Sequence, residues 1–168
     1  RSQRDIASYA NWFAARGFVC ASIDYRVEDQ YGLLPDWWGP EAPEGLPEYL
    51  PQDTANRWQA FYPAGRDAQA ALRWLASEGP KLYNIDPDFS TVAGGSAGGF
   101  LVALLGAADP GDYTDELSAG EDPTLESTWL ETAPSLGSVI VLWGAPTLLL
   151  ALEHYDGVSR FDASDAPL

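Results

Sequence analysis

The 168-residue sequence has very few of the residues that build disulfides and zinc sites, because it holds one cysteine, Cys20, and one histidine, His154. One cysteine cannot form an internal disulfide, and this pair cannot supply the four ligands of a structural zinc site. We expect neither a metal nor a cofactor. Cys20 lies in the apolar run Phe18–Ala21, where free cysteine behaves as a small hydrophobic residue, so we expect it to be buried.

Basic residues are also scarce, since nine Lys and Arg face 25 Asp and Glu and the formal net charge is −16. This balance disfavours nucleic acids and anionic membranes as partners. The longest apolar stretch, Ser138–Leu152, is interrupted by Gly144 and Pro146 and falls short of the roughly 20 residues that span a bilayer. Residues 1–17 lack the apolar segment of a signal peptide. We expect a soluble protein with no membrane span, while its compartment, secretion included, and its oligomeric state stay open.

Hydrophobic residues make up 46% of the chain, enough to fill a core, and they are arranged in alternating helical and strand-like segments. The expected helices cover residues 2–16, 63–76, 100–107 and 148–155, and the expected strands cover residues 18–23, 89–93 and 138–143. Short apolar runs of this kind are typical of buried parallel strands. The alternation predicts one α/β domain over residues 1–168, with a mostly parallel sheet and right-handed crossovers.

Residues 27–62 show no periodicity and are rich in proline and tryptophan. Five prolines interrupt them, and Trp37 and Trp38 are adjacent. Long irregular segments are uncommon in compact domains and often serve function, and exposed aromatic pairs often mark contact surfaces. We therefore predict a rim or lid beside a binding site, with a passive surface excursion as the alternative.

The sequence Gly-Gly-Ser-Ala-Gly at positions 94–98 lies between an expected strand and an expected helix. It matches G-x-S-x-G, the tight turn that presents a nucleophilic serine. Gly94, Gly95 and Gly98 suit such a turn because side chains two residues before and two after the serine would collide with backbone. Ser96 would then project above the carboxyl ends of the strands, and the Ala97 N–H would be an oxyanion donor.

Two other interpretations of this turn stay open. Ser96 can simply cap the following helix, which is a common role for serine. A phosphate-binding loop fits less well, because the spacing differs from G-x-x-x-x-G-K-[ST] and no lysine follows.

A nucleophilic serine also needs a base. His154 is one candidate, with a surface position near Tyr155 as the alternative. Candidate acids lie in an acidic connection that is typical of solvated surface: Asp109, Asp112, Asp115 and Asp122.

Several segments together resemble the carboxylesterase/lipase-like α/β-hydrolases, in particular the hormone-sensitive-lipase-like and feruloyl-esterase-like group. In chain order these are Ala14–Val19, Asp24–Arg26, Pro63 with Asp67, Ala71–Leu75, Ile85–Pro87 and Ala93–Gly99. The resemblance implies a three-layer α/β/α fold, of which this chain is the central part. It places an HGGG-like oxyanion segment before Arg1, and the catalytic acid and histidine beyond Leu168 in the order Ser, acid, His. By that order, His154 comes too early to be the base.

The resemblance implies a serine hydrolase that cleaves small carboxylic esters through an acyl-enzyme on Ser96. A serine peptidase of the prolyl-oligopeptidase type is one alternative. A catalytically silent fold or an inert fragment is another, because fold alone does not establish catalysis. Other polar residues are expected to hold loops by hydrogen bonds, and Trp74 is expected to pack on its helix. The expected loop-holding residues are Asp24, Tyr25, Arg26 and Asp67.

Overall fold

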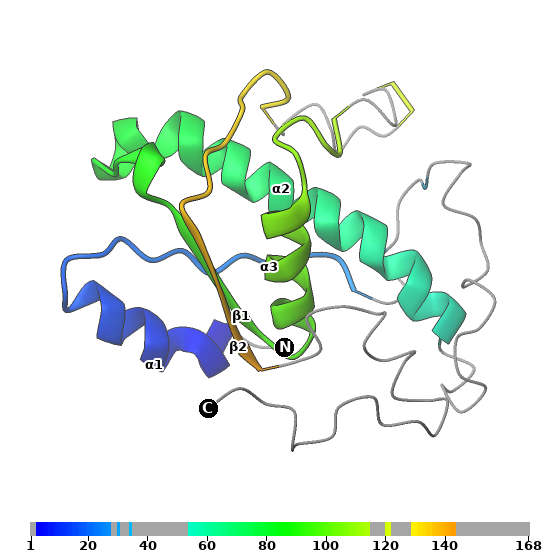
Figure 1. The fold of residues 1–168 in the computed structure, drawn as a ribbon, viewed down its shortest axis with the longest axis horizontal. Helices are drawn as coiled ribbons and strands as arrows, with labels where there is room; N and C mark the ends of the chain where they lie inside the picture. Colours follow the sequence, from blue (N-terminus) through cyan, green and yellow to red (C-terminus); the bar gives the residue numbers. More distant parts are fainter. Residues whose placement is uncertain are drawn as a thin grey trace, which may run out of the picture.

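The computed structural model describes residues 3–27, 30, 34, 54–114, 120–121 and 129–143. In chain order these form helix α1 (Gln3–Ala14), helix α2 (Thr54–Tyr83), a 3₁₀ helix (Pro87–Phe89), strand β1 (Thr91–Gly95), helix α3 (Ala97–Ala107) and strand β2 (Ser138–Trp143). The two strands are parallel neighbours, α3 packs against both of them, and α2 packs against α3 (Figure 1). The described core is thus α/β, with α3 as the helix that connects two parallel strands.

Helix α1 matches the prediction and ends in a Schellman motif. The N–H of Gly17 donates to the carbonyl of Ala14 at 3.1 Å, and the N–H of Phe18 donates to that of Phe13 at 3.3 Å. Gly17 has φ of +91°, the left-handed conformation that this cap requires and glycine adopts without strain. The rings of Phe13 and Phe18 meet edge to face at 5.7 Å, the apolar contact that accompanies the motif.

Helix α2 is longer than predicted, and the predicted start at Pro63 is wrong. The helix runs through both Pro63 and Pro80. A proline inside a helix removes a backbone donor and typically costs about 3 kcal/mol. Burial offsets this cost, because Pro63 and its neighbours Tyr62 and Ala64 are all buried. Tertiary packing therefore decides where this helix begins.

The longer α2 also takes in part of the segment predicted to form a rim or lid. Residues 54–62 belong to the helix. Residues 27, 30 and 34 are the other described positions of the 27–62 segment, and Trp37 and Trp38 lie outside the described residues. The role of this segment as a rim or lid stays a prediction.

The two strands form one parallel ladder. Thr91 pairs with Ser138, and the register continues to an irregularity between Gly94 and Gly95, where Gly95 pairs with Trp143. The prediction of 138–143 as a strand is confirmed residue for residue. The strand predicted at 89–93 begins two residues later, because Phe89 belongs to the 3₁₀ helix that is capped by the side chain of Asp86.

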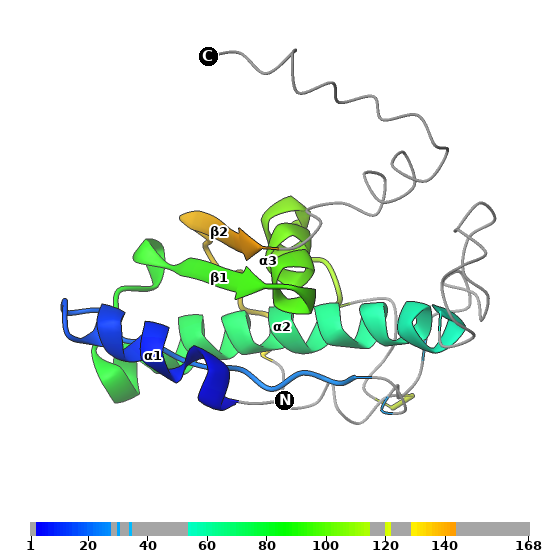
Figure 2. The same ribbon diagram turned by 90° about the horizontal axis from the view of Figure 1, so that it is seen from below.

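The strand predicted at residues 18–23 is wrong. These residues are an irregular segment, which lies beside the middle of α2 (Figure 2). A strand needs a hydrogen-bonding neighbour, and the sheet of the described residues contains β1 and β2 alone. Cys20 is accordingly exposed rather than buried, and Phe18 and Val19 are more than half exposed.

The burial expected for the apolar strand at residues 138–143 is not observed, and one end of α3 is also exposed. Val139, Ile140, Val141 and Leu142 are 37–41% exposed, because among the described helices α3 is the one with extensive contacts to this strand. In α3, Leu101, Val102 and Leu105 are buried against its neighbours, whereas the last two residues of the helix are exposed. None of the helices in the described ranges is both long and apolar enough to cross a membrane.

Arg26 and Asp67 join the irregular segment to the middle of α2, as predicted for loop-holding residues. The Arg26 guanidinium donates from Nη2 to Asp67 Oδ1 at 2.7 Å and from Nε to Oδ2 at 2.9 Å. The backbone N–H of Arg26 adds a third bond to Oδ2 at 2.7 Å. Both side chains are about one-fifth exposed, at 18% and 23%, so water screens this pair less than it screens a surface ion pair.

Replacing Asp67 by alanine should therefore lower the free energy of unfolding by about 2 kcal/mol, since hydrogen bonds to charged groups contribute about 1.5–3 kcal/mol each. Chemical denaturation followed by circular dichroism measures this change. The double variant Arg26→Ala/Asp67→Ala should cost clearly less than the sum of the two single variants, because both single changes remove the pair of guanidinium and carboxylate. Asp67→Ala also removes the acceptor of the Arg26 backbone N–H, so it should be the more costly of the two single changes. Costs that simply add would show that the two side chains are not coupled.

Trp129 is the first described residue of the segment that leads into β2, and it packs against α2. Its ring meets Trp74 edge to face at 6.4 Å, and Trp74 also contacts Tyr83, so the packing predicted for Trp74 is confirmed. The pKa of Glu78 is lowered, first by its hydrogen bond from Lys81 and then by hydrogen bonds from Ser77 and Trp129. The ring contact with Trp74 thus places Trp129 beside the C-terminal part of α2.

Candidate functional site

Ser96 occupies the single residue between β1 and α3, in a conformation that L-amino acids rarely adopt. Its φ is 55° and its ψ is −124°. These angles are close to those of the first central position of a type II′ turn, which glycine dominates. A residue held there is strained by about 1–3 kcal/mol, and such strain persists only where the surrounding structure imposes it. The side chain of Ser96 is exposed.

Gly94 leaves no room for a side chain, because β1 passes directly against the first turn of α3. A Cβ atom on Gly94 would lie 2.2 Å from the carbonyl oxygen of Gly98 and 2.4 Å from its carbonyl carbon. Both neighbours are backbone atoms, so a rotamer change cannot relieve the contact. Glycine at position 94 is therefore required by the tightness of the turn.

Gly98 has no such requirement, and the expectation that a side chain there would collide is wrong. A Cβ atom on Gly98 would meet nothing within 4 Å among the described residues. The close approach involves the carbonyl of Gly98, whereas its missing side chain would point into open space. Gly95 is half-buried at the end of β1, beyond the irregularity in the ladder.

The side chain of Ser96 makes no capping hydrogen bond to α3. The helix begins through the backbone instead, since the carbonyl of Ser96 accepts from the N–H of Gly99 at 2.9 Å and from that of Phe100 at 3.2 Å. An N-cap serine normally has extended backbone angles and accepts a hydrogen bond on its side chain, and Ser96 has neither. These two differences disfavour the interpretation of Ser96 as a plain cap.

The N–H of Ala97 lies beside the Ser96 hydroxyl, at the start of α3. As the first residue of the helix, Ala97 has no acceptor within it. The aligned peptide dipoles place about half a positive charge at this end. An exposed hydroxyl, an N–H without an acceptor in its own helix and a positive helix end thus adjoin one another, an arrangement that can stabilise negative charge on a ligand oxygen.

The structure does not bring a base or an acid to Ser96 within the residues that it describes. His154, Asp115, Asp122 and the predicted helix at 148–155 lie outside them. Asp109 and Asp112 follow the far end of α3, which is 11 residues or about 16 Å long. These two carboxylates are therefore not candidates for orienting a base at Ser96.

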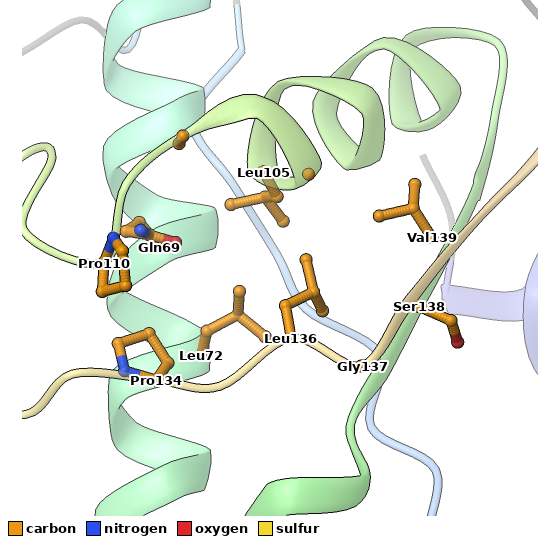
Figure 3. Close-up of a pocket in the computed structure, with 11 residues that line it drawn as sticks. Gln69, Leu72, Leu105, Pro110, Pro134, Leu136, Gly137, Ser138 and Val139 are labelled. Carbon is orange, nitrogen blue, oxygen red and sulfur yellow. The ribbon is translucent and has the colours of Figure 1, made fainter.

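Sequence reasoning missed two half-open pockets, and neither includes Ser96. One, of about 310 Å³, lies between residues 21–24 and the face of α2 that carries Trp74. The other, of about 300 Å³, lies at the far end of α3 (Figure 3). No sequence signal pointed to either, because each is formed by segments that are distant in the chain. In the described ranges, no three His, Cys, Asp or Glu side chains are grouped as metal ligands.

Comparison with known proteins gives one informative similarity. The chain is 34% identical over 128 residues to Esterase LipC of Mycobacterium tuberculosis, an alignment that covers 74% of this chain and 24% of that protein. The chain thus spans about a quarter of the length of this relative. No family model matches the chain, and no solved structure matches it. The similarity supports the esterase/lipase-like resemblance, and the parallel strands with their helices are consistent with an α/β-hydrolase fold.

Proposed function

We propose that this protein is a carboxylic ester hydrolase in which Ser96 is the nucleophile. The observation that carries the proposal is the backbone of Ser96, which holds an exposed serine in a glycine-like conformation between a strand and a helix. A strained, non-glycine residue whose side chain makes no capping hydrogen bond is typical of functional positions. The similarity to a protein named as an esterase supports the same reaction class.

In this mechanism the Ser96 hydroxyl loses its proton to a base and attacks the carbonyl carbon of the ester. The negative charge that develops on the carbonyl oxygen is stabilised by the Ala97 N–H and by the positive end of α3. Removing one such donor typically costs about 3–4 kcal/mol in the transition state. The base returns its proton to the departing alcohol, and water then cleaves the acyl-enzyme to release the acid and restore Ser96.

The proposal leaves two candidates for the base that takes the proton of Ser96. His154 is the only histidine in these 168 residues, and its pKa range suits proton transfer near neutral pH. The order Ser, acid, His of the resembled enzymes instead places the acid and the base beyond Leu168. The two assignments of the base predict different masses for the polypeptide that carries an activated Ser96. A base at His154 allows 18.2 kDa, and a base beyond Leu168 requires a heavier polypeptide.

Fluorophosphonate labelling of the protein from its natural source tests the proposal, because the reagent reacts with activated serines. Intact mass and peptide mapping should show one label, on Ser96, and none in a Ser96→Ala variant. A Ser90→Ala variant is the matched control, since the Ser90 hydroxyl is engaged by the carbonyl of Ser135. Label at 18.2 kDa would assign the base to His154, and label on a heavier polypeptide would assign it to a residue beyond Leu168.

An unlabelled Ser96 would overturn the proposal and leave a catalytically silent fold. Substrate choice needs a second measurement. The labelled protein should hydrolyse p-nitrophenyl acetate or butyrate and leave a proline-containing peptide intact. Cleavage of the peptide with no turnover of the esters would favour the peptidase alternative.

A further inference from the structure

Two aromatic side chains, Phe61 on α2 and Phe100 on α3, lie in contact close to the turn that carries Ser96. Their ring centroids are 4.7 Å apart and the ring planes are tilted by 35°, which is within the range of packed aromatic rings. The N–H of Phe100 donates to the carbonyl of Ser96 at 3.2 Å. Phe100 therefore lies one helical turn after Ser96, on the same side of the helix. These two residues are called the aromatic pair below.

The aromatic pair belongs to a row of contacts that joins α2 to α3. Four residues further along each helix, Gly65 meets Leu104 so closely that a Cβ atom on Gly65 would lie 2.9 Å from the leucine Cδ2. Four residues further along α2 again, the amide of Gln69 donates to the carbonyl of Asp109 at 3.2 Å. Helices pack through rows of this spacing. Since the row runs toward the C-terminal end of α3, the aromatic pair is the contact at its Ser96 end.

The direction of a helical side chain brings the ring of Phe100 toward the turn. In an α-helix the Cα–Cβ bond leans toward the N-terminus, and a long side chain covers the turn that precedes its own Cα. For Phe100 that turn starts at Ser96 and Ala97. Both members of the aromatic pair are half-buried, whereas Gly65 and Gln69 further along the row are buried. The aromatic pair thus keeps apolar surface that a ligand bound at Ser96 can contact.

The chemistry of the aromatic pair indicates which part of an ester it contacts. Phenylalanine has no hydrogen-bonding group in its side chain, so the pair binds through apolar contact. In the acyl-enzyme mechanism the acyl group stays bonded to Ser96 through both steps, whereas the alcohol leaves in the first. We propose that Phe61 and Phe100 bind the acyl chain and determine a preference for longer apolar acyl groups over acetyl. This inference rests on the proposed function and adds the residues that select the substrate.

The kcat/KM values of the natural protein for p-nitrophenyl butyrate and p-nitrophenyl acetate test the proposal. We expect butyrate to be favoured about tenfold, because each methylene group that leaves water contributes roughly fourfold. Phe100→Ala and Phe61→Ala, which change the wall from two different helices, should each lower this butyrate-to-acetate ratio about fivefold. The ratio compares two substrates on one preparation, so a partly unfolded variant still gives a valid value. If neither alanine variant folds, Phe100→Leu should give an intermediate ratio.

Phe89→Ala is the matched control, because Phe89 is 85% exposed and precedes β1, at the opposite end of the strand from Ser96. Its butyrate-to-acetate ratio should equal that of the wild type. A second series varies the alcohol, with ethyl acetate and butyl acetate as substrates, and Phe100→Ala should leave the ratio of these two unchanged.

Two results would overturn the assignment of the aromatic pair to the acyl chain. One is an unchanged butyrate-to-acetate ratio in the variants of Phe61 and Phe100, and the other is a change confined to the alcohol series. In both cases esters are still hydrolysed, so the proposed function stands. Failure of the proposed function looks different, because no ester is then hydrolysed and Ser96 takes no fluorophosphonate label, and the assignment of the aromatic pair fails with it.

Discussion

Replacing Ser96 by glycine should raise the melting temperature of the protein while abolishing its reaction with fluorophosphonate. Glycine adopts φ of 55° and ψ of −124° without the steric cost that Ser96 bears. Relief of about 1–3 kcal/mol of strain is partly offset by the greater freedom of glycine in the unfolded chain, which costs about 0.5–1 kcal/mol. A net gain of about 1 kcal/mol corresponds to a rise of roughly 2–4 °C for a chain of this size.

Ser96→Ala is the matched control, because alanine keeps the Cβ atom and hence the strain. Its melting temperature should stay close to that of the wild type, and it too should lose the label. Hydrolysis of esters by the natural protein should fall on the order of 10⁶-fold in both variants, the typical effect of removing a nucleophilic serine. Scanning calorimetry and initial rates provide the two measurements. A lower melting temperature for Ser96→Gly than for Ser96→Ala would contradict the assignment of strain to this residue.

Gly94→Ala should destabilise the protein by about 3 kcal/mol, or roughly 6–12 °C in melting temperature. The new methyl group would lie 2.2 Å from the carbonyl oxygen of Gly98. Either β1 or the first turn of α3 must then move, and both also pack elsewhere. The shift would displace Ser96 and Ala97 relative to each other, so labelling by fluorophosphonate should also be lost.

Gly98→Ala provides the comparison for that variant on the other side of the same turn. Among the described residues, a methyl group on Gly98 meets nothing within 4 Å, and alanine is preferred over glycine inside a helix by up to about 1 kcal/mol. We therefore expect this variant to be as stable as the wild type or slightly more stable, and to keep its label. Chemical denaturation of the two variants side by side makes the test. Equal losses of stability in Gly94→Ala and Gly98→Ala would contradict this difference between the two positions and show that the turn needs glycine at both.

The elements that sequence analysis located correctly are those with a strong local signal. The end of α1 follows from Gly17, whose freedom at positive φ permits the cap. Strand β2 follows from a β-branched apolar run between turn residues. The glycine-rich turn at 94–98 was recognised from its spacing, and the structure places Ser96 in a glycine-like conformation between β1 and α3. In each case the signal lies in residues that are close together in the sequence.

The predictions that failed all depended on what lies beside a segment in space. The apolar run at 18–23 looks like a strand, yet strand formation depends on a neighbour with free hydrogen-bonding groups, and exposure of Cys20 follows from the same cause. Pro63 predicts a helix start, but burial of its neighbours lets α2 continue through it. The need for glycine differs between positions 94 and 98 because only Gly94 faces the backbone of Gly98.

By itself, the sequence determined the α/β class, the position of the strand-to-helix turn and the choice of Ser96 as the candidate nucleophile, because these depend on local backbone freedom and on the period of apolar residues. Tertiary structure alone decided the strain at Ser96, the contact that makes Gly94 obligatory, and the tie between Arg26 and Asp67. The tie joins residues that are 41 positions apart in the chain, and the strain and the close contact arise from the way β1 meets the first turn of α3.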